Sequence, residues 1–157
     1  MSDYFKNINE IKFEGENSVN PLSFRFYDEN KIIMGKKMKD HLRFATCYWH
    51  TFTWPGLDPF GGPTFDRPWM NSSDPLKMAE IKLNEAFDFF QKIKTPFFCF
   101  HDRDISPEGS NYNETQNNFF HIIDLMQSKM EETGTKLLWG TANAFSHKRY
   151  MSGASTN

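Results

Sequence analysis

Four side chains that can exchange protons or carry charge, His-Asp-Arg-Asp at residues 101–104, directly follow an apolar segment. That segment, Phe97 to Phe100, is typical of a strand buried on both faces of a parallel sheet. The residues after such a strand lie at its C-terminal end, where α/β sheets and barrels carry their active sites. Because an imidazole with carboxylates nearby can move protons near neutral pH, this run predicts proton-transfer chemistry.

The rest of the chain predicts the elements that hold this run in place. One helix is expected to begin at Asp74-Pro75, an N-cap followed by a proline at the first helical position, and to end at Thr95-Pro96. A second is expected from about residue 113 to Gly134, a typical residue just after a helix C-terminus. Buried strands are expected at residues 44–49, 97–100 and 136–139. Long helices between short strands imply a parallel sheet with right-handed crossovers.

The C-terminal ends of parallel strands lie on one side of the sheet, so their side chains are expected to converge. An aromatic-walled pocket with a histidine and carboxylates suits a sugar, whose C–H faces pack on rings while its hydroxyls take the polar groups. The convergent set comprises Trp49 and His50 from the first strand, residues 101–104 from the second, and Trp139, Thr141, Asn143 and Phe145 from the third.

Each of these residues also has a plainer interpretation. His101 can satisfy a hydrogen bond in the core or cap a turn, and Asp104 can pair with Arg103 in a surface ion pair of little energetic value. The tryptophans and Phe145 can be core residues, as aromatic side chains usually are. The functional interpretation therefore depends on their joint placement at the strand ends.

The composition argues against several function classes. With 157 residues one domain is expected, and a net charge of −2 without a run of like charges argues against nucleic-acid binding. No apolar run approaches the length of a membrane span, and the first residues do not form a signal peptide. Cys47 and Cys99 lie in separate apolar runs, which favours free thiols in a reducing compartment and hence a cytoplasmic protein.

Three common motifs are not found in the sequence. The run at residues 101–104 lacks the several convergent carboxylates that Mg²⁺ or Mn²⁺ needs, so no dedicated metal site is expected in this chain. Gly61-Gly62 has neither the strand-to-helix context nor the lysine of a phosphate-binding loop. No serine or cysteine has a base beside it in a nucleophile setting.

Four stretches cover nearly the whole chain in order: IKFEGENSVNPLSFRFYD, LRFATCYWHTFTWPGLDPFGGPTFDRPW, PFFCFHDRDISPEG and ETGTKLLWGTANAFSHKRYMSGASTN. They resemble the N-terminal part of the xylose isomerase family, in its longer-armed subgroup; HDRD and WGTANAF are the most specific parts. The resemblance implies an α/β fold, a partial (β/α)8 TIM barrel with about the first three strands and two helices. An N-terminal arm is expected at residues 1–37 and the incomplete barrel at residues 38–157. Because a whole barrel needs ~250 residues, we expect the chain to be a piece of a larger protein.

The same resemblance implies roles for individual residues. His101 corresponds to the family's histidine that contacts the ring oxygen or the C1 hydroxyl of the sugar and assists ring opening. Asp104 corresponds to the carboxylate that holds this imidazole. The positions that correspond to the wall of the sugar pocket or lie near the bound sugar are Trp49, Trp139, Thr141 and Phe145.

The family's reaction opens the cyclic sugar and moves a hydride between C1 and C2, which converts D-xylose to D-xylulose. Two divalent cations (Mg²⁺, Mn²⁺ or Co²⁺) polarise the substrate oxygens, and their ligands and the catalytic lysine lie on later strands, outside this chain. Phe60 matches a ring that the family inserts into the neighbouring subunit's active site. A homo-oligomer, expected to be a tetramer, and a small sugar substrate are the implied partners, and the isolated chain is expected to be inactive.

Two further interpretations stay open from the sequence alone. The chain can be a catalytically inactive remnant of a barrel, whose open strand edges would promote aggregation. It can also belong to another metal-dependent barrel enzyme, either a different sugar isomerase or an apurinic endonuclease. The acidic balance and the absence of basic stripes argue against the nuclease, and the tryptophan and phenylalanine residues favour a sugar.

Overall fold

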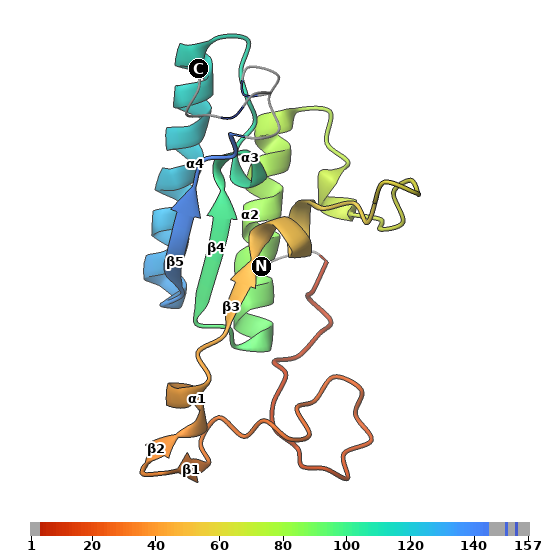
Figure 1. Cartoon of the computed structure of the whole chain (residues 1–157), viewed down its shortest axis with the longest axis vertical. Helices are drawn as coiled ribbons and strands as arrows, with labels where there is room; N and C mark the ends of the chain where they lie inside the picture. The colour runs from red at the N-terminus through yellow and green to blue at the C-terminus, as the bar shows by residue number, and fades with distance from the viewer. Residues whose placement is uncertain (1–3, 145–149, 151–152, 154–157) are drawn as a thin grey trace.

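Three parallel strands and two long helices form the centre of the structure, a computed structural model that describes residues 4–144, 150 and 153 (Figure 1). In chain order the elements are β1 (Ile32–Ile33), β2 (Lys36–Lys37), α1 (Met38–His41), β3 (Ala45–Cys47), the π-helix η1 (Trp49–Thr53), the 3-10 helix η2 (Pro68–Met70), α2 (Pro75–Ile93), β4 (Phe97–His101), α3 (Asp102–Ile105), α4 (Tyr112–Thr133) and β5 (Lys136–Thr141). The predicted α/β class and the alternation of strands with two long helices are confirmed.

The central sheet has the order β3-β4-β5, and both neighbouring pairs are parallel, as the sequence predicts. The register of β4 and β5 shifts between Phe98 and Cys99, so that β5 carries one extra residue there. Three registered pairs are important for the site: Cys47 with Cys99, Cys99 with Trp139, and His101 with Thr141. Side chains of registered residues in a parallel pair lie on the same face of the sheet.

Both long helices cover one face of the sheet, and its other face is turned towards the viewer in Figure 1. Phe98 of β4 points to the helices, since its ring packs on Phe87 and Phe90 of α2 at centroid distances of 5.4 and 5.3 Å. Because side chains alternate along a strand, Cys99 and His101 lie on the opposite, helix-free face. Their registered neighbours on β3 and β5 share this face.

The two long helices begin and end at residues with specific capping geometry. The Asp74 carboxylate accepts two backbone N–H bonds in the first turn of α2, at 2.9 and 3.1 Å. Asn111 caps α4 in the same way at 3.0 Å, and Gly134 ends it with a left-handed φ of 73°. The predicted helix boundaries are therefore confirmed. Within the described residues, no helix has the length and apolarity needed to span a bilayer.

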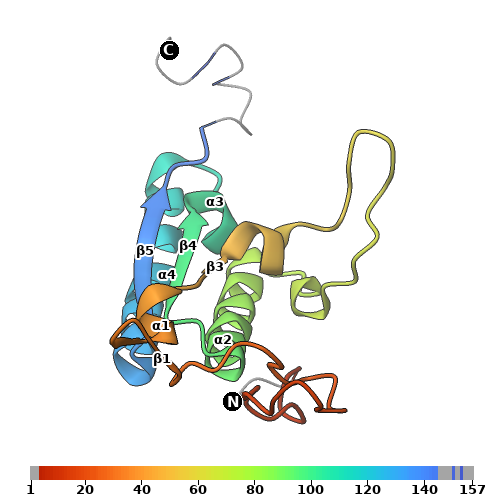
Figure 2. The same cartoon turned by 60° about the horizontal axis from the view of Figure 1, so that its bottom comes forward.

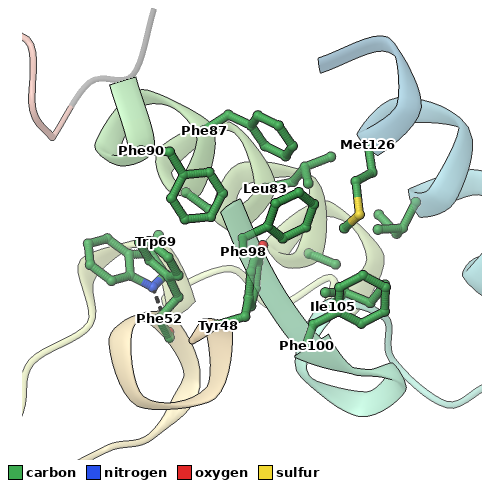
Figure 3. Packing of buried hydrophobic residues seen from close by; sticks show 13 residues of the cluster. Tyr48, Phe52, Trp69, Leu83, Phe87, Phe90, Phe98, Phe100, Ile105 and Met126 are labelled. Carbon is green, nitrogen blue, oxygen red and sulfur yellow. Dashed lines mark hydrogen bonds between the residues drawn. The ribbon is translucent and has the colours of Figure 1, made fainter. Parts of the chain in front are cut away.

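The core is an aromatic cluster between the sheet and α2 (Figure 3). Phe98 is fully buried and stacks on Phe90, while Met126 of α4 closes the cluster from the other side. The Trp69 ring of η2 donates its Nε1–H to the carbonyl of Phe52 at 2.9 Å, which fastens η1 to the core. The position of η1, directly after β3, is thus fixed by burial and by this hydrogen bond.

The structure corrects the predicted first strand. Residues 44–49 were expected to be extended, but β3 ends at Cys47, and Trp49 and His50 lie in the π-helix η1. The helical turn buries both Tyr48 and Phe52, four residues apart, and their rings pack at 5.1 Å. This packing overrides the strand preference of a segment rich in aromatic and β-branched residues. The expectation that Trp49 and His50 lie at the end of the first strand is therefore wrong.

Two further expectations, one about a strand and one about the run that follows a strand, are corrected. The third strand was expected to be buried, yet every residue of β5 is exposed, including Leu138 and Trp139 at 56% and 42%. The strand lies at the edge of the sheet, with a single neighbouring strand among the described residues. The polar run after β4 was not expected to be helical, yet Asp102–Ile105 form the one-turn helix α3.

Residues 4–37 contain little regular structure, and part of this segment contacts the C-terminal end of α2. Their hairpin pairs β1 with β2, and Lys94 binds Glu10 and Glu29 at 2.7 and 2.9 Å. Phe5 packs on Trp69 at a ring distance of 6.0 Å. The segment is therefore joined to the helical layer at both ends of its described length, and its assignment as a separate arm stays a prediction.

Replacing Phe98 by alanine should lower the free energy of unfolding by about 3–5 kcal/mol, because a fully buried ring leaves a cavity among Phe87, Phe90 and Phe100. Urea denaturation followed by circular dichroism measures the change. Phe26→Ala is the matched control, since this ring is 75% exposed and its loss should cost less than about 0.5 kcal/mol. Equal effects of the two substitutions would contradict the assigned core.

Candidate active site

The structure places His101 and Asp104 in direct contact at the C-terminal end of β4. The Asp104 Oδ2 atom lies 3.0 Å from Nδ1 of His101, and it also accepts the backbone N–H of His101 at 2.8 Å. The Asp104 side chain is 1% exposed, whereas that of His101 is 22% exposed. A buried carboxylate thus holds an imidazole that solvent or a ligand can still reach.

The one-turn helix α3 creates this contact. His101 is its N-cap and Asp104 its third helical residue, and the two form a reciprocal capping box. In such a box each side chain bonds to the backbone N–H of the other residue, which satisfies donors that the first helical turn leaves unpaired. The short carboxylate at position 104 reaches both the backbone and the ring, so local helix capping and imidazole orientation depend on the same atom.

Asp102 accepts hydrogen bonds from the backbone of two other residues. Oδ1 of Asp102 accepts the backbone N–H of Arg103 at 2.7 Å and that of Asn143 at 2.8 Å. The second bond joins the end of β5 to the end of β4, because Asn143 lies two residues after β5. Asp102 therefore helps to hold the two strand ends side by side, in agreement with a structural role.

Two predicted pocket residues lie on the helix-free face with His101. The ring of Trp139 meets that of His101 edge-on, at a centroid distance of 5.7 Å and an angle of 74°. Thr141 is the registered neighbour of His101 and is exposed. An aromatic wall and a hydroxyl thus flank the imidazole, as a sugar-binding surface requires.

The other predicted pocket residues are placed differently. Trp49 is half-buried in η1 and does not belong to a strand end. The ring of Phe60 is 97% exposed in a loop where Asp58 and Gly61 form an isolated bridge. Phe145 lies outside the described residues. The structure therefore brings together His101, Asp104, Trp139 and Thr141, and it presents Phe60 away from the core.

A set of buried polar side chains behind Asp104 was not foreseen from the sequence. Lys82 is 5% exposed, and its Nζ lies 3.4 Å from Oγ1 of Thr53 and 5.9 Å from the ring centroid of Tyr48. Burial lowers the pKa of Lys82 to about 8, although the negative charge of Asp104 acts in the opposite direction. Burial also raises the pKa of Tyr48, and the charge of Asp104 adds to this effect. The sequence held one sign of this buried lysine: Lys82 stands within the apolar stripe of α2, three residues after Ala79.

Cys47 and Cys99 form a registered pair on the same face of the sheet, and Cys99 lies two residues before His101 in β4. Both thiols are free, and Cys99 is buried. Burial, with Cys47 beside it, raises the pKa of the Cys99 thiol to about 11. Because the thiolate is the nucleophilic form, a thiol with a raised pKa is poorly reactive, so we assign these residues to packing.

The arrangement suits proton transfer by His101. The tautomer with the proton on Nδ1 lets the ring donate to the Asp104 carboxylate and leaves the lone pair on Nε2, whereas the other tautomer lets Nδ1 accept the backbone N–H of Asp104 in the capping box. The carboxylate fixes the orientation of the ring. Among the described residues there is no group of three or more His, Cys, Asp or Glu side chains that could hold a metal ion.

Replacing Asp104 by alanine should abolish the preference of the neutral imidazole for the proton on Nδ1, because the acceptor at 3.0 Å is lost. The ¹⁵N chemical shifts of the ring nitrogens measure this preference. Asp102→Ala is the control from the same helical turn, since its carboxylate accepts from backbone N–H groups. An unchanged tautomer in Asp104→Ala would show that other contacts fix the ring.

Curated proteins named xylose isomerase match the chain over its whole length. The protein of Photobacterium profundum is 59% identical over 157 residues, that of Allorhizobium ampelinum 55% over 154 residues, and that of a Marinomonas species 54% over 157 residues. These matches cover 98–100% of this chain but only 35–36% of each relative, so the chain spans about a third of their length. No family model matches the chain. More than half of the residues are identical throughout, so the chain is similar over its whole length to proteins named xylose isomerase, and it spans about a third of their length.

Proposed function

We propose that this chain forms part of a xylose isomerase and supplies the groups that open the sugar ring. The observation that carries the proposal is the contact between His101 and the buried Asp104 at a strand end, in a chain 59% identical to a xylose isomerase. The longer protein would interconvert D-xylose and D-xylulose. The three parallel strands, with helices on one face, are compatible with the first strands of a TIM barrel preceded by an arm at residues 1–37.

In this proposal His101 moves the proton that ring opening requires. Opening a cyclic sugar breaks the bond between C1 and the ring oxygen, while the C1 hydroxyl loses a proton and the ring oxygen gains one. The imidazole of His101 can accept or donate that proton through Nε2, since Nδ1 is directed to Asp104. Asp104 holds the ring in this orientation.

The neighbouring side chains would orient the sugar. The exposed ring of Trp139, 5.7 Å from that of His101, offers a flat surface for the C–H face of the sugar. Thr141 offers a hydroxyl on the same face of the sheet. Trp49 and Phe145 would complete the wall of the pocket, as the family resemblance implies.

The metal ions that the family resemblance implies do not fit the residues described here. No group of three or more potential ligands is present among residues 4–144, 150 and 153, so we derive no step of the reaction through a metal. In the proposal, two divalent cations are held by residues of the longer protein outside this chain. His101 and Asp104 act on the ring-opening step alone.

The fully exposed Phe60 supports a contribution to a second subunit. A phenylalanine ring that is 97% exposed is unfavourable in water, and a neighbouring subunit would bury it. We propose that Phe60 enters the active site of the adjacent subunit in a homotetramer. The enzyme would work in the cytoplasm, where Cys47 and Cys99 stay reduced.

In the longer protein, assayed with D-xylose and Mg²⁺, His101→Asn should lower kcat by about 10²–10⁴-fold, the usual contribution of a general acid–base residue. Formation of D-xylulose measures the effect. His121→Asn is the matched control, because this histidine is an exposed helix residue that binds Glu80 at 2.8 Å. Normal turnover by His101→Asn would exclude His101 from the mechanism.

The 157-residue chain alone should not convert D-xylose to D-xylulose at any Mg²⁺ concentration, because its described residues hold no metal-ligand cluster. The assay uses chain purified from a host without its own xylose isomerase. Metal-dependent isomerisation by this preparation would refute the proposal that the metal ligands lie outside the chain.

A further inference from the structure

A buried positive charge lies behind the His101–Asp104 pair. Lys82 belongs to the apolar stripe of α2, and only 5% of its surface is exposed. Taking an ammonium group out of water is costly unless a negative charge and hydrogen-bond acceptors surround it. The contacts of Lys82 therefore need to provide that compensation.

The contacts of Lys82 join three elements at this point. Its Nζ donates to Oγ1 of Thr53, the last residue of η1, at 3.4 Å. That hydroxyl in turn donates to the backbone carbonyl of Asp104 in α3, also at 3.4 Å. The ring of Tyr48 lies 5.9 Å from Nζ, within the range of a cation–π contact. A chain of two hydrogen bonds thus leads from α2 through η1 to the helix that carries the carboxylate.

The negative charge of the buried Asp104 acts on Lys82 and favours its ammonium form. The Asp104 side chain is 1% exposed, and its charge raises the pKa of Lys82 against the larger lowering by burial. Other titratable groups around the amine are weaker candidates, because burial favours the neutral form of Tyr48 and of Cys99. Glu85 lies three residues further along α2 and is also buried.

We propose that Lys82 is a positioning residue for the His101–Asp104 pair. Its ammonium group balances the buried charge of Asp104, and its link through Thr53 holds α3 so that the Asp104 carboxylate stays directed at Nδ1 of His101. The importance of this role for catalysis rests on the proposed ring-opening function. The electrostatic coupling between Lys82 and Asp104 does not, and it is tested separately.

The test is an NMR titration of Lys82 in the full chain with ¹³C,¹⁵N-labelled lysine. Asp104→Asn should lower the titration midpoint of Lys82 by about 1 unit or more, as expected when a nearby opposite charge is removed. Asp102→Asn is the control, because its carboxylate binds backbone N–H groups of residues 103 and 143. A midpoint unchanged in Asp104→Asn would overturn the proposal.

Substitutions of Lys82 distinguish positioning from simple packing. Lys82→Met keeps the length of the side chain but removes the charge, and it should reduce the fraction of His101 that carries its proton on Nδ1, measured by ¹⁵N shifts. Lys82→Arg should restore that fraction, whereas Tyr48→Phe, which keeps the ring near Nζ, should leave it unchanged. An unchanged tautomer in a folded Lys82→Met would reduce Lys82 to a structural role. If Lys82→Met does not fold, the midpoint shift in Asp104→Asn decides.

The outcomes separate this inference from the proposed function. A midpoint shift together with a longer protein that lacks isomerase activity would support the Lys82–Asp104 coupling and refute the function. Isomerase activity without a midpoint shift would refute the coupling and leave the function in place.

Discussion

The buried carboxylate of Asp104 is the constraint on which the site depends. One of its oxygen atoms accepts the backbone N–H of His101 at 2.8 Å and lies 3.0 Å from the ring Nδ1 of the same residue. The first bond begins helix α3, and the second fixes the imidazole. Because a charge with 1% exposure is unfavourable without partners, the surrounding structure has to supply compensating groups. Helix formation, ring orientation and the burial of Lys82 are therefore linked through one side chain.

The parallel register determines which other side chains lie beside His101 on the helix-free face of the sheet. Cys47, Cys99 and Trp139 form one registered row, and His101 and Thr141 form the next. The hydrogen bond from the Asn143 backbone to Asp102 fixes the end of β5 against that of β4. The aromatic core on the other face sets the register, since Phe98 and Phe100 interlock with α2. Packing on one face thus determines which side chains meet on the other.

The sequence predicts those parts of the fold that depend on local signals. The long helices follow from Asp74, Asn111 and Gly134, whose capping chemistry acts within one turn. The strand β4 and the parallel order follow from the apolar runs and the helix lengths. The boundary between β3 and η1 does not, because residues 48–53 favour a strand and become helical through contacts with Trp69 and α2.

In the site, too, the sequence predicts the contacts that depend on local spacing and does not predict those that depend on tertiary packing. The proximity of His101 and Asp104 follows from their spacing once a helical turn is assumed, but a histidine at the N-cap is not among the usual capping residues, so α3 was not foreseen. Lys82 and Thr53 were not foreseen either, since they reach Asp104 from elements 22 and 51 residues away in the sequence. Contacts of this kind arise from tertiary packing, and no local pattern encodes them.

The exposure of β5 connects the chain to its longer relatives. Leu138 and Trp139 are 56% and 42% exposed on a strand with one neighbouring strand among the described residues, an arrangement that favours pairing with a further strand. The relatives are about three times as long as the part that this chain matches, so they have residues to provide such a strand. A strand added beside β5 would extend the sheet, with His101 and Trp139 still on its helix-free face. The exposure that makes β5 unfavourable as an edge in water is therefore the property that would let the sheet continue beside the imidazole.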